Sequence, residues 1–369
     1  MSYCINPKCS HRLNPDAQQT CQACGTPLMV QQRYRLLEPL RALDEWDTTE
    51  IFEVDDGGQR RVFKILKAAK LLPHFQREAQ TLQRVRHPGI PQVEPDGFFT
   101  IEVPAGQVHC LVMEKVAGHT LEQWLKEHGP ISESLAVEWL GQMGEILHQI
   151  HTQGLFHRDI KLSNMMLRPQ GQLVLIDFGT VRPVTNTYLA KIAVAQEVTS
   201  VVSPGYTPLE QINGKAVPQS DFYALGRSIV HLLTGQHPVG LPEDDQTGEL
   251  GWQPSAPPLS PRLAQLIDQL IAPFPRQRPL SAQAILQQLA QLSASAPLAA
   301  QPLPQSALKR ILQPSLRTLV ALNVGLLCLN LLLGWYRFAS PADTDQSYEA
   351  ANGVSLPLAN VSLAKFNRL

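Results

Sequence analysis

The sequence lacks an excess of charge of either sign. Its 31 Lys and Arg residues nearly balance 32 Asp and Glu residues, which gives a formal net charge of −1 and an isoelectric point near 6.8. Proteins that bind nucleic acid usually carry a clear basic excess, so we set this function class aside. No apolar signal peptide opens the chain either, and we therefore expect its N-terminus to stay in the cytoplasm.

Cysteine is scarce outside one short segment at the start of the chain. Four of the six cysteines fall in the pattern Cys4-x₄-Cys9-x₁₁-Cys21-x₂-Cys24. Four thiolates satisfy a tetrahedral Zn²⁺ ion, and a segment this short could not fold on a core of its own. A reducing cytosol argues against disulfides. We expect a zinc-ribbon-like module with structural Zn²⁺ in residues 1–32; a redox switch, an iron–sulfur site and His11 as a ligand are the alternatives.

Two short motifs carry the clearest chemical signal. The first is His157-Arg158-Asp159-Ile160-Lys161-Leu162-Ser163-Asn164, and the second, 18 positions after Asp159, is Asp177-Phe178-Gly179. Both match elements of phosphoryl transfer from ATP, in which one Asp accepts a hydroxyl proton while an Asn and a second Asp hold Mg²⁺. The pattern predicts Asp159 as the base, Lys161 beside the transferred group, and Asn164 with Asp177 as Mg²⁺ ligands. The alternative is that the two Asp residues are a turn cap and a solvated loop acid.

The motifs belong to a longer resemblance to the protein kinase family, over residues 33–292. The segment 61–65 alternates like a strand and places Lys64 where the family's lysine pairs with the α- and β-phosphates of ATP. Glu78, on the amphipathic stretch His74–Val85, fits the helix glutamate that pairs with that lysine. The alternative for Glu78 is a surface charge beside Arg77.

The same resemblance implies an α+β, two-lobed fold with a small lobe at 33–115 and a large lobe at 116–292. The segment 111–116 resembles the last strand of the small lobe and the hinge that follows it. In that alignment Met113 is the gatekeeper, and backbone groups of Glu114 and Val116 face adenine.

Landmarks of the large lobe follow in the family's order. Residues 203–210 resemble the end of an activation segment, in which Glu210 is expected to pair with Arg278. Asp221 resembles the aspartate that braces the catalytic loop. Each of these could instead be a solvated surface charge.

Hydroxyl residues near the catalytic loop indicate substrate class and regulation. Lys161 favours Ser/Thr over Tyr substrates, and Thr207 fits the threonine that contacts the catalytic Asp and Lys in Ser/Thr kinases. Arg158 could pair with a phosphate on the activation segment, which makes Thr199, Ser200 and Ser203 candidate regulatory sites, or these are unmodified loop residues.

The opening segment adds a narrower resemblance. Residues 2–7 and 21–28, followed by 33–37, look like the four-cysteine prefix of cyanobacterial Ser/Thr protein kinases. This resemblance implies a bacterial signalling enzyme of eukaryotic-like type that acts on protein substrates.

Glycine is missing where the family has its phosphate loop. Between the expected strands 33–40 and 49–54 stands Arg41-Ala42-Leu43-Asp44-Glu45-Trp46-Asp47, whose side chains obstruct close approach of the backbone to phosphate and whose three acids repel it. Two alternatives to an active kinase follow. One is a pseudokinase scaffold with weak or no phosphotransfer. The other is a carrier for a zinc module that recruits a protein partner.

The composition shifts after the kinase-like segment. Residues 293–317 are rich in Ala, Pro, Gln and Ser and are typical of a linker, whereas 318–336 contain no Asp, Glu, Lys, Arg or His. Nineteen residues of helix span roughly 28 Å, enough for one bilayer crossing. The excess of basic residues before the run predicts a cytoplasmic kinase domain and a short tail, 337–369, across the membrane. Asn323 and Asn330 could join two such helices in a homodimer, or be tolerated singly.

Overall fold

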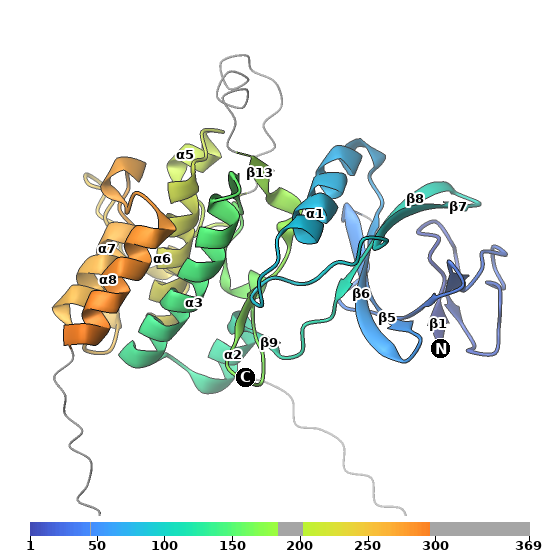
Figure 1. Cartoon of the computed structure of the whole chain (residues 1–369), viewed down its shortest axis with the longest axis horizontal. Helices are drawn as coiled ribbons and strands as arrows, with labels where there is room; N and C mark the ends of the chain where they lie inside the picture. The colour runs from blue at the N-terminus through green and yellow to red at the C-terminus, as the bar shows by residue number, and fades with distance from the viewer. Residues whose placement is uncertain (45, 184–201, 296–369) are drawn as a thin grey trace, which may run out of the picture. The chain divides into compact units, whose positions relative to one another are not determined.

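One antiparallel sheet dominates the amino-terminal part of the structure, a computed structural model that describes residues 1–44, 46–183 and 202–295. Its strand order is β3-β4-β5-β6-β8-β7, and Figure 1 labels β5, β6, β7 and β8 of this sheet. The strands are β3 (Met29–Val30), β4 (Tyr34–Pro39), β5 (Thr49–Asp56), β6 (Gln59–Leu66), β7 (Phe98–Val103) and β8 (Gly106–Glu114). Strands β4, β5, β6 and β8 match segments expected as strands of the small lobe, whereas β3 and β7 were not expected.

The four-cysteine module is attached to this sheet directly. Its own strands β1 (Ser2–Tyr3) and β2 (Leu13–Asn14) pair with each other, and β3 pairs with β4 through Val30 and Tyr34. The sequence predicts a module that ends at residue 32, and the structure adds that its last residues form the first strand of the small-lobe sheet.

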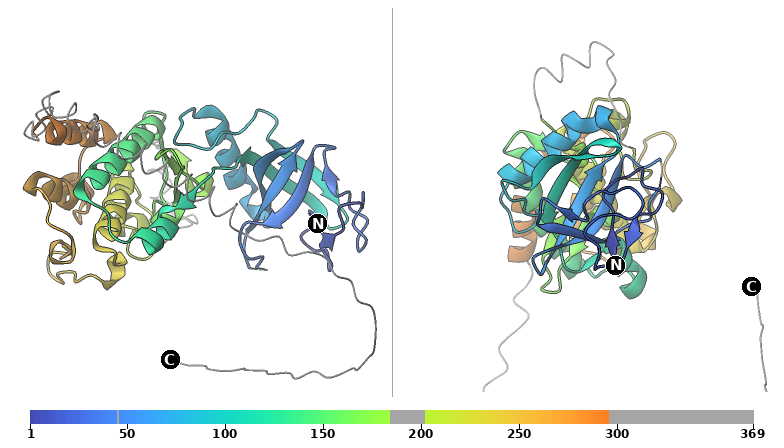
Figure 2. Two further views of the ribbon diagram at one scale, coloured as in Figure 1. Left: turned by 90° about the horizontal axis from the view of Figure 1, so that it is seen from below. Right: turned by 90° about the vertical axis from the view of Figure 1, so that its right-hand side faces the viewer.

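Helix α1 (Leu72–Arg84) lies beside the sheet, as Figures 1 and 2 show. Its buried positions include Phe75, Glu78, Ala79 and Leu82, a spacing of 3, 1 and 3 residues that marks one face of a helix. Glu78 thus belongs to the buried face, which excludes the alternative of a surface charge. A buried carboxylate needs a partner, and the fold must supply one.

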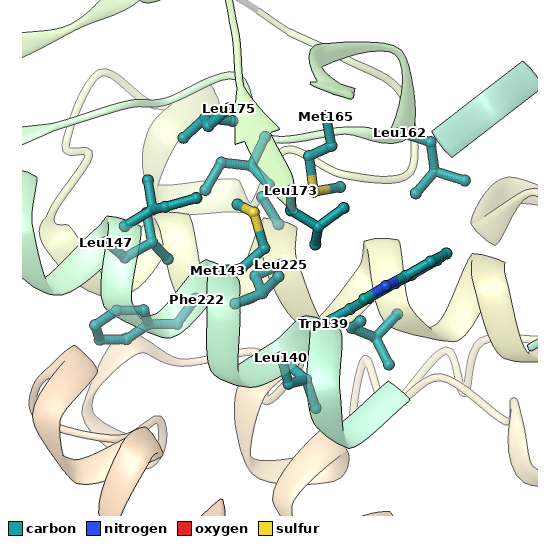
Figure 3. Packing of buried hydrophobic residues seen from close by; sticks show 14 of the residues in the cluster. Trp139, Leu140, Met143, Leu147, Leu162, Met165, Leu173, Leu175, Phe222 and Leu225 are labelled. Atoms are coloured by element: carbon teal, nitrogen blue, oxygen red, sulfur yellow. The ribbon is translucent and has the colours of Figure 1, made fainter. Parts of the chain in front are cut away.

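The large lobe is built from helices packed around α3. They are α2 (Leu121–His128), α3 (Glu133–His151), α5 (Leu209–Ile212), α6 (Pro218–Thr234), α7 (Pro261–Leu270) and α8 (Ala282–Ser295). Ser132 caps α3 by accepting a hydrogen bond from the backbone N–H of Leu135. Figure 3 shows Trp139, Met143 and Leu147 of α3 meeting Phe222 and Leu225 of α6 in the core, and all five are buried.

Short strands hold the catalytic segments against this helical core. They are β9 (His119–Thr120), β10 (Leu155–Phe156), β11 (Met165–Leu167), β12 (Leu173–Leu175) and β13 (Arg182–Pro183). Both ends of the catalytic loop are therefore fixed, because β10 precedes it and β11 follows it. The flanking strands therefore fix where the loop begins and ends.

The carboxyl-terminal predictions fall mainly outside the described residues. Helix α8 continues to Ser295, past the expected domain end at residue 292. The chain divides after Ala296 into a second unit, Pro297–Leu369, which contains the expected apolar span. Among the residues that the structure describes, none of the helices has the length and apolar character needed to cross a membrane.

Candidate active site

Lys64 contacts one carboxylate from each lobe. Its Nζ lies 2.8 Å from Oε1 and 3.0 Å from Oε2 of Glu78 on α1, and 3.0 Å from Oδ1 of Asp177. Strand β6 presents Lys64 and the buried face of α1 presents Glu78, so the pairing follows from the two elements' patterns. The contact predicted between Lys64 and Glu78 is present.

Lys64 and Asp177 stabilise each other's charges, whereas burial raises the pKa of Glu78. Burial alone would lower the pKa of Lys64, but the carboxylates of Asp177 and Glu78 outweigh it and raise that pKa. The Lys64 ammonium in turn holds the pKa of Asp177 well below its usual range. Lys64 and Asp177 are therefore both ionised at neutral pH, as a phosphate-binding cation and a metal ligand must be.

Asp159 stands at the centre of a hydrogen-bonded group on the catalytic loop. Asn164 Nδ2 donates to the carboxylate Oδ2 and to the backbone oxygen of Asp159, both at 2.9 Å, and Lys161 Nζ lies 2.9 Å from Oδ2. Ser203 Oγ donates to the other carboxylate oxygen, Oδ1, at 2.7 Å. Asp159 is neither a turn cap nor solvent-exposed, because its side chain is held by three neighbours.

Ser203, and not Thr207, is the hydroxyl residue that contacts Asp159 and Lys161. Lys161 Nζ donates to Ser203 Oγ at 3.1 Å, whereas Thr207 Oγ1 accepts from the backbone N–H of Ser203 at 2.8 Å. The prediction for Thr207 was wrong. Ser203 is also buried, so its hydroxyl serves the active site here rather than standing ready for phosphorylation. Thr199 and Ser200 lie outside the described residues.

Asp221 braces the catalytic loop from α6, as expected. Its buried carboxylate accepts the backbone N–H groups of His157 at 2.8 Å and Arg158 at 2.7 Å, and His151 Nε2 lies 2.8 Å from Oδ2. Arg158 adopts φ of 73°, a region that costs a non-glycine residue energy, and the two hydrogen bonds to Asp221 hold the backbone there. Gln211 also holds this backbone, because its side-chain Nε2 donates to Arg158 O at 2.6 Å. The sequence alone did not single out Gln211.

The predicted pair of Glu210 and Arg278 is present. Arg278 donates from both terminal nitrogens to the Glu210 carboxylate, at 2.6 and 3.3 Å, and its side chain is fully buried. The pair ties the end of the activation segment to the segment after α7. Neither residue is a solvated surface charge.

The expected hinge follows β8 directly. Met113 faces Val62 across the β6–β8 pair, and the backbone N–H of Glu114 donates to Gln92 O at 2.8 Å. The side chain of Glu114 forms an ion pair with Arg168 on the large lobe. Val116, the other residue expected to face adenine, is buried beyond the strand end.

A cavity of about 320 Å³ opens between the phosphate-loop segment and the Lys64 cluster. Lys64, Glu78 and Asp177 line it, together with Arg41 and Asp47 of the loop. The expected hinge residues are not part of its lining. The structure therefore places Lys64 and Asp177 at this cavity, whereas Asn164 and the adenine-side residues are not part of its lining.

The glycine-free segment forms a closed turn. Asp44 Oδ1 accepts the backbone N–H of Trp46 at 2.9 Å, and Lys67 Nζ donates to Asp44 O at 2.5 Å. Asp44 therefore serves the turn, and of the two loop acids that the structure describes only Asp47 lines the cavity. Glu45 lies outside the described residues. Of the two acids described, Asp47 is therefore the one whose charge opposes a phosphate in the cavity.

The four cysteines gather as a metal site requires. Their Sγ atoms all lie within 4.8 Å of one another, with Cys4 and Cys24 3.5 Å apart and Cys9 and Cys21 3.6 Å apart. A tetrahedral Zn²⁺ site with Zn–S bonds of about 2.3 Å needs sulfur separations of roughly 3.8 Å. Asn14 Nδ2 donates to Cys21 Sγ at 3.6 Å, a contact that stabilises a thiolate. The donor set and its spacing fit a tetrahedral metal ion.

The sequence contains a protein kinase domain over residues 54–289, and the chain belongs to the protein kinase family. It is 35% identical over 302 residues to serine/threonine-protein kinase B of Synechocystis sp., which covers 76% of this chain and 50% of the relative. It is 38% identical over 270 residues to serine/threonine-protein kinase PknA of Nostoc sp., covering 68% of this chain and 45% of the relative. Both organisms are cyanobacteria, in line with the expected resemblance, and the chain spans about half the length of these relatives.

Proposed function

We propose that the chain is a serine/threonine protein kinase that transfers the γ-phosphate of ATP to protein hydroxyls. The observation that carries this proposal is the group around Asp159, in which Asn164, Lys161 and Ser203 fix both carboxylate oxygens. Relatives at 35% and 38% identity are named as serine/threonine-protein kinases. A scaffold has no chemical need for this arrangement, so the pseudokinase reading is disfavoured.

The residues present fit Mg²⁺ and a nucleotide phosphate. Asn164 uses its amide nitrogen on Asp159, which leaves its side-chain oxygen for a metal, and Asp177 commits only Oδ1 to Lys64. Oxygen donors of this kind are what Mg²⁺ prefers. Bound Mg²⁺ would neutralise phosphate charge, with Asn164 and Asp177 as its protein ligands and Lys64 beside the phosphates.

Asp159 has the position of a base. Its carboxylate is held by donors, so it can orient a substrate hydroxyl and accept its proton as that oxygen becomes a nucleophile. Lys161, bonded to both Asp159 and Ser203, places a positive charge next to the same point. The chemistry asked of the protein is positioning and charge neutralisation.

The test is transfer of radiolabelled γ-phosphate by the purified full chain, with Mg²⁺ and a generic acceptor protein. We expect label on Ser and Thr in phosphoamino-acid analysis, and loss of turnover by about two to four orders of magnitude in Asp159→Asn, with nucleotide affinity nearly unchanged. A matched control is Asp268→Asn, on α7. Wild type that binds Mg·ATP but transfers no label, to acceptor or to itself, would return the scaffold reading.

Two finer assignments are part of the proposal. The four-cysteine geometry supports structural Zn²⁺, and the apolar run 318–336 supports a single-pass membrane anchor with the kinase domain in the cytoplasm and a homodimer through that helix. Cell fractionation tests the anchor: truncation before Lys309 should move the protein from the membrane pellet to the soluble fraction. Extraction of the intact chain by alkaline carbonate would contradict a spanning helix.

A further inference from the structure

The phosphate-loop segment lacks the backbone donors that glycines would provide, yet it contributes a cation to the cavity. Arg41 lines the same space of about 320 Å³ as Lys64 and Asp177, and its side chain is 42% exposed. Arg41 follows Leu40, the first residue after β4. The backbone N–H of Leu40 donates to Ile51 O at 2.8 Å and closes the base of the loop. Arg41 is thus carried on a fixed part of the loop and not at its tip.

The hydrogen bonding of Arg41 leaves most of its donors unused. One terminal nitrogen, Nη2, donates to Thr49 O at 2.5 Å and Thr49 Oγ1 at 3.0 Å, and lies 3.5 Å from Asp47 Oδ2. A guanidinium has five N–H donors on three nitrogens. Among the residues that the structure describes, Nε and Nη1 of Arg41 make no hydrogen bond, so a planar pair of donors remains for a ligand.

Other cations at this cavity are committed or enclosed. Lys64 is bonded to Glu78 and Asp177, and Arg158 is only 3% exposed. A triphosphate brings several negative charges, which one already paired lysine does not balance. An arginine fork binds phosphate oxygens in a bidentate fashion that a point charge cannot reproduce. The exposed, under-used cation beside Lys64 is therefore the group best suited to phosphate.

We propose that Arg41 is a nucleotide-binding residue that contacts the phosphates of ATP and takes over the task of the missing glycine amides. This inference rests on the proposed kinase function and deepens it, because it says how a glycine-free loop binds Mg·ATP. Asp47 opposes it: the carboxylate 3.5 Å from Nη2 competes with phosphate for the same cation. In this loop the Arg41 guanidinium thus replaces the backbone donors, and the Asp47 carboxylate is its counter-charge.

The experiment measures dissociation constants of the full chain for Mg·ATP, ADP and adenosine by calorimetry, in wild type, Arg41→Gln, Arg41→Lys and Arg60→Gln. Arg60 is a matched control because it is an exposed arginine of the same sheet, 52% exposed and outside the cavity lining. Arg41→Gln should weaken Mg·ATP binding about ten- to hundredfold, the value of charged hydrogen bonds, and leave adenosine unchanged. Arg41→Lys should lie between, and Arg60→Gln should match wild type.

Three results would overturn the proposal. They are unchanged Mg·ATP affinity in Arg41→Gln, an equal loss for adenosine, which would show a structural role, and an equal loss in Arg60→Gln. Thermal unfolding of each variant separates loss of binding from loss of fold. The proposed kinase function fails on its own if wild type binds Mg·ATP through Arg41 but transfers no phosphate. If wild type transfers phosphate and Arg41→Gln keeps the wild-type KM for ATP, the kinase function stands and the role of Arg41 fails.

Discussion

Replacing Glu210 by alanine should destabilise the large lobe more than any single change of a surface charge. The substitution removes the acceptor of two Arg278 nitrogens and of Ser220 Oγ, which donates to Glu210 at 2.8 Å. Arg278 cannot reach water instead, because its side chain has no exposed surface. The variant therefore leaves a buried guanidinium without its counter-charge.

The size of the effect follows from that burial. Removal of one partner of a buried ion pair costs about 3–5 kcal/mol of the free energy of unfolding. For a domain of this size each kcal/mol lowers the Tm by about 2–4 °C, so a fall of roughly 6–20 °C is expected. Arg278 keeps the backbone oxygens of Ala272 and Pro273 as acceptors, which favours the lower end of the range.

Urea unfolding followed by tryptophan fluorescence measures the change, since Trp139 and Trp252 are buried in the large lobe. The double variant Glu210→Ala/Arg278→Met should recover much of the stability, because no unpaired charge remains. A loss below about 1 kcal/mol for the single change, or a double variant that loses the sum of both single changes, would refute the reasoning.

Three further predictions concern the active site, the metal and acid stability. Ser203→Ala should lower kcat about two- to tenfold, the effect of losing one positioning hydrogen bond, while Ser203→Thr should keep the wild-type kcat. Equal kcat in wild type and both variants would contradict the role of Ser203 in positioning Asp159. Metal analysis of the full chain should find about one Zn²⁺, and a chelator should remove it with loss of circular dichroism; a metal-free chain with an unchanged spectrum would exclude the site. Burial and His237 lower the pKa of His231 to about 4, and Tyr206 lies 2.6 Å from its Nδ1. As the pH falls, His231 gains a proton in the unfolded chain near pH 6.5 but in the folded chain only near pH 4. The free energy of unfolding should therefore fall between about pH 6.5 and 4, and fall less in His231→Gln. Identical urea midpoints of the two proteins across this window would contradict this prediction.

The order of landmarks along the chain was enough to predict most contacts of the site. Lys64 on a strand, Glu78 on the following helix and Asp177 after the catalytic loop meet in the structure as that order implies. Lys64 and Glu78 are predictable because each lies on a buried face of a strand or helix, whereas Asp177 is an exposed loop residue that only its Asp-Phe-Gly motif identifies. Four strands of the small lobe were predicted from the sequence, but β7 (Phe98–Val103) was not.

Contacts that depend on the register of a loop were not predictable. Ser203 and Thr207 are both hydroxyl residues on one short segment, and residue type does not distinguish which reaches Asp159. Only the fold separates them, because the Ser203 backbone N–H donates to Thr207 Oγ1 while Ser203 Oγ reaches Asp159.

The docking of the amino-terminal module was likewise not visible in the sequence. Arg12 lies 2.8 Å from Glu50 on β5, and its guanidinium covers the Phe52 ring at 5.2 Å from the centroid. This contact needs both partners' positions in space, which no local pattern gives.

The pairing of β3 with β4 has a consequence for how the protein behaves in solution. An uncovered strand at the border of a sheet invites pairing with another molecule, and β4 would be such a border without Met29 and Val30. Because β3 follows directly on the cysteine cluster, a protein stripped of metal should tend to self-associate through β4. Light scattering should then show larger particles in chelator-treated protein than in untreated protein. In that case the cysteine cluster protects the protein from aggregation.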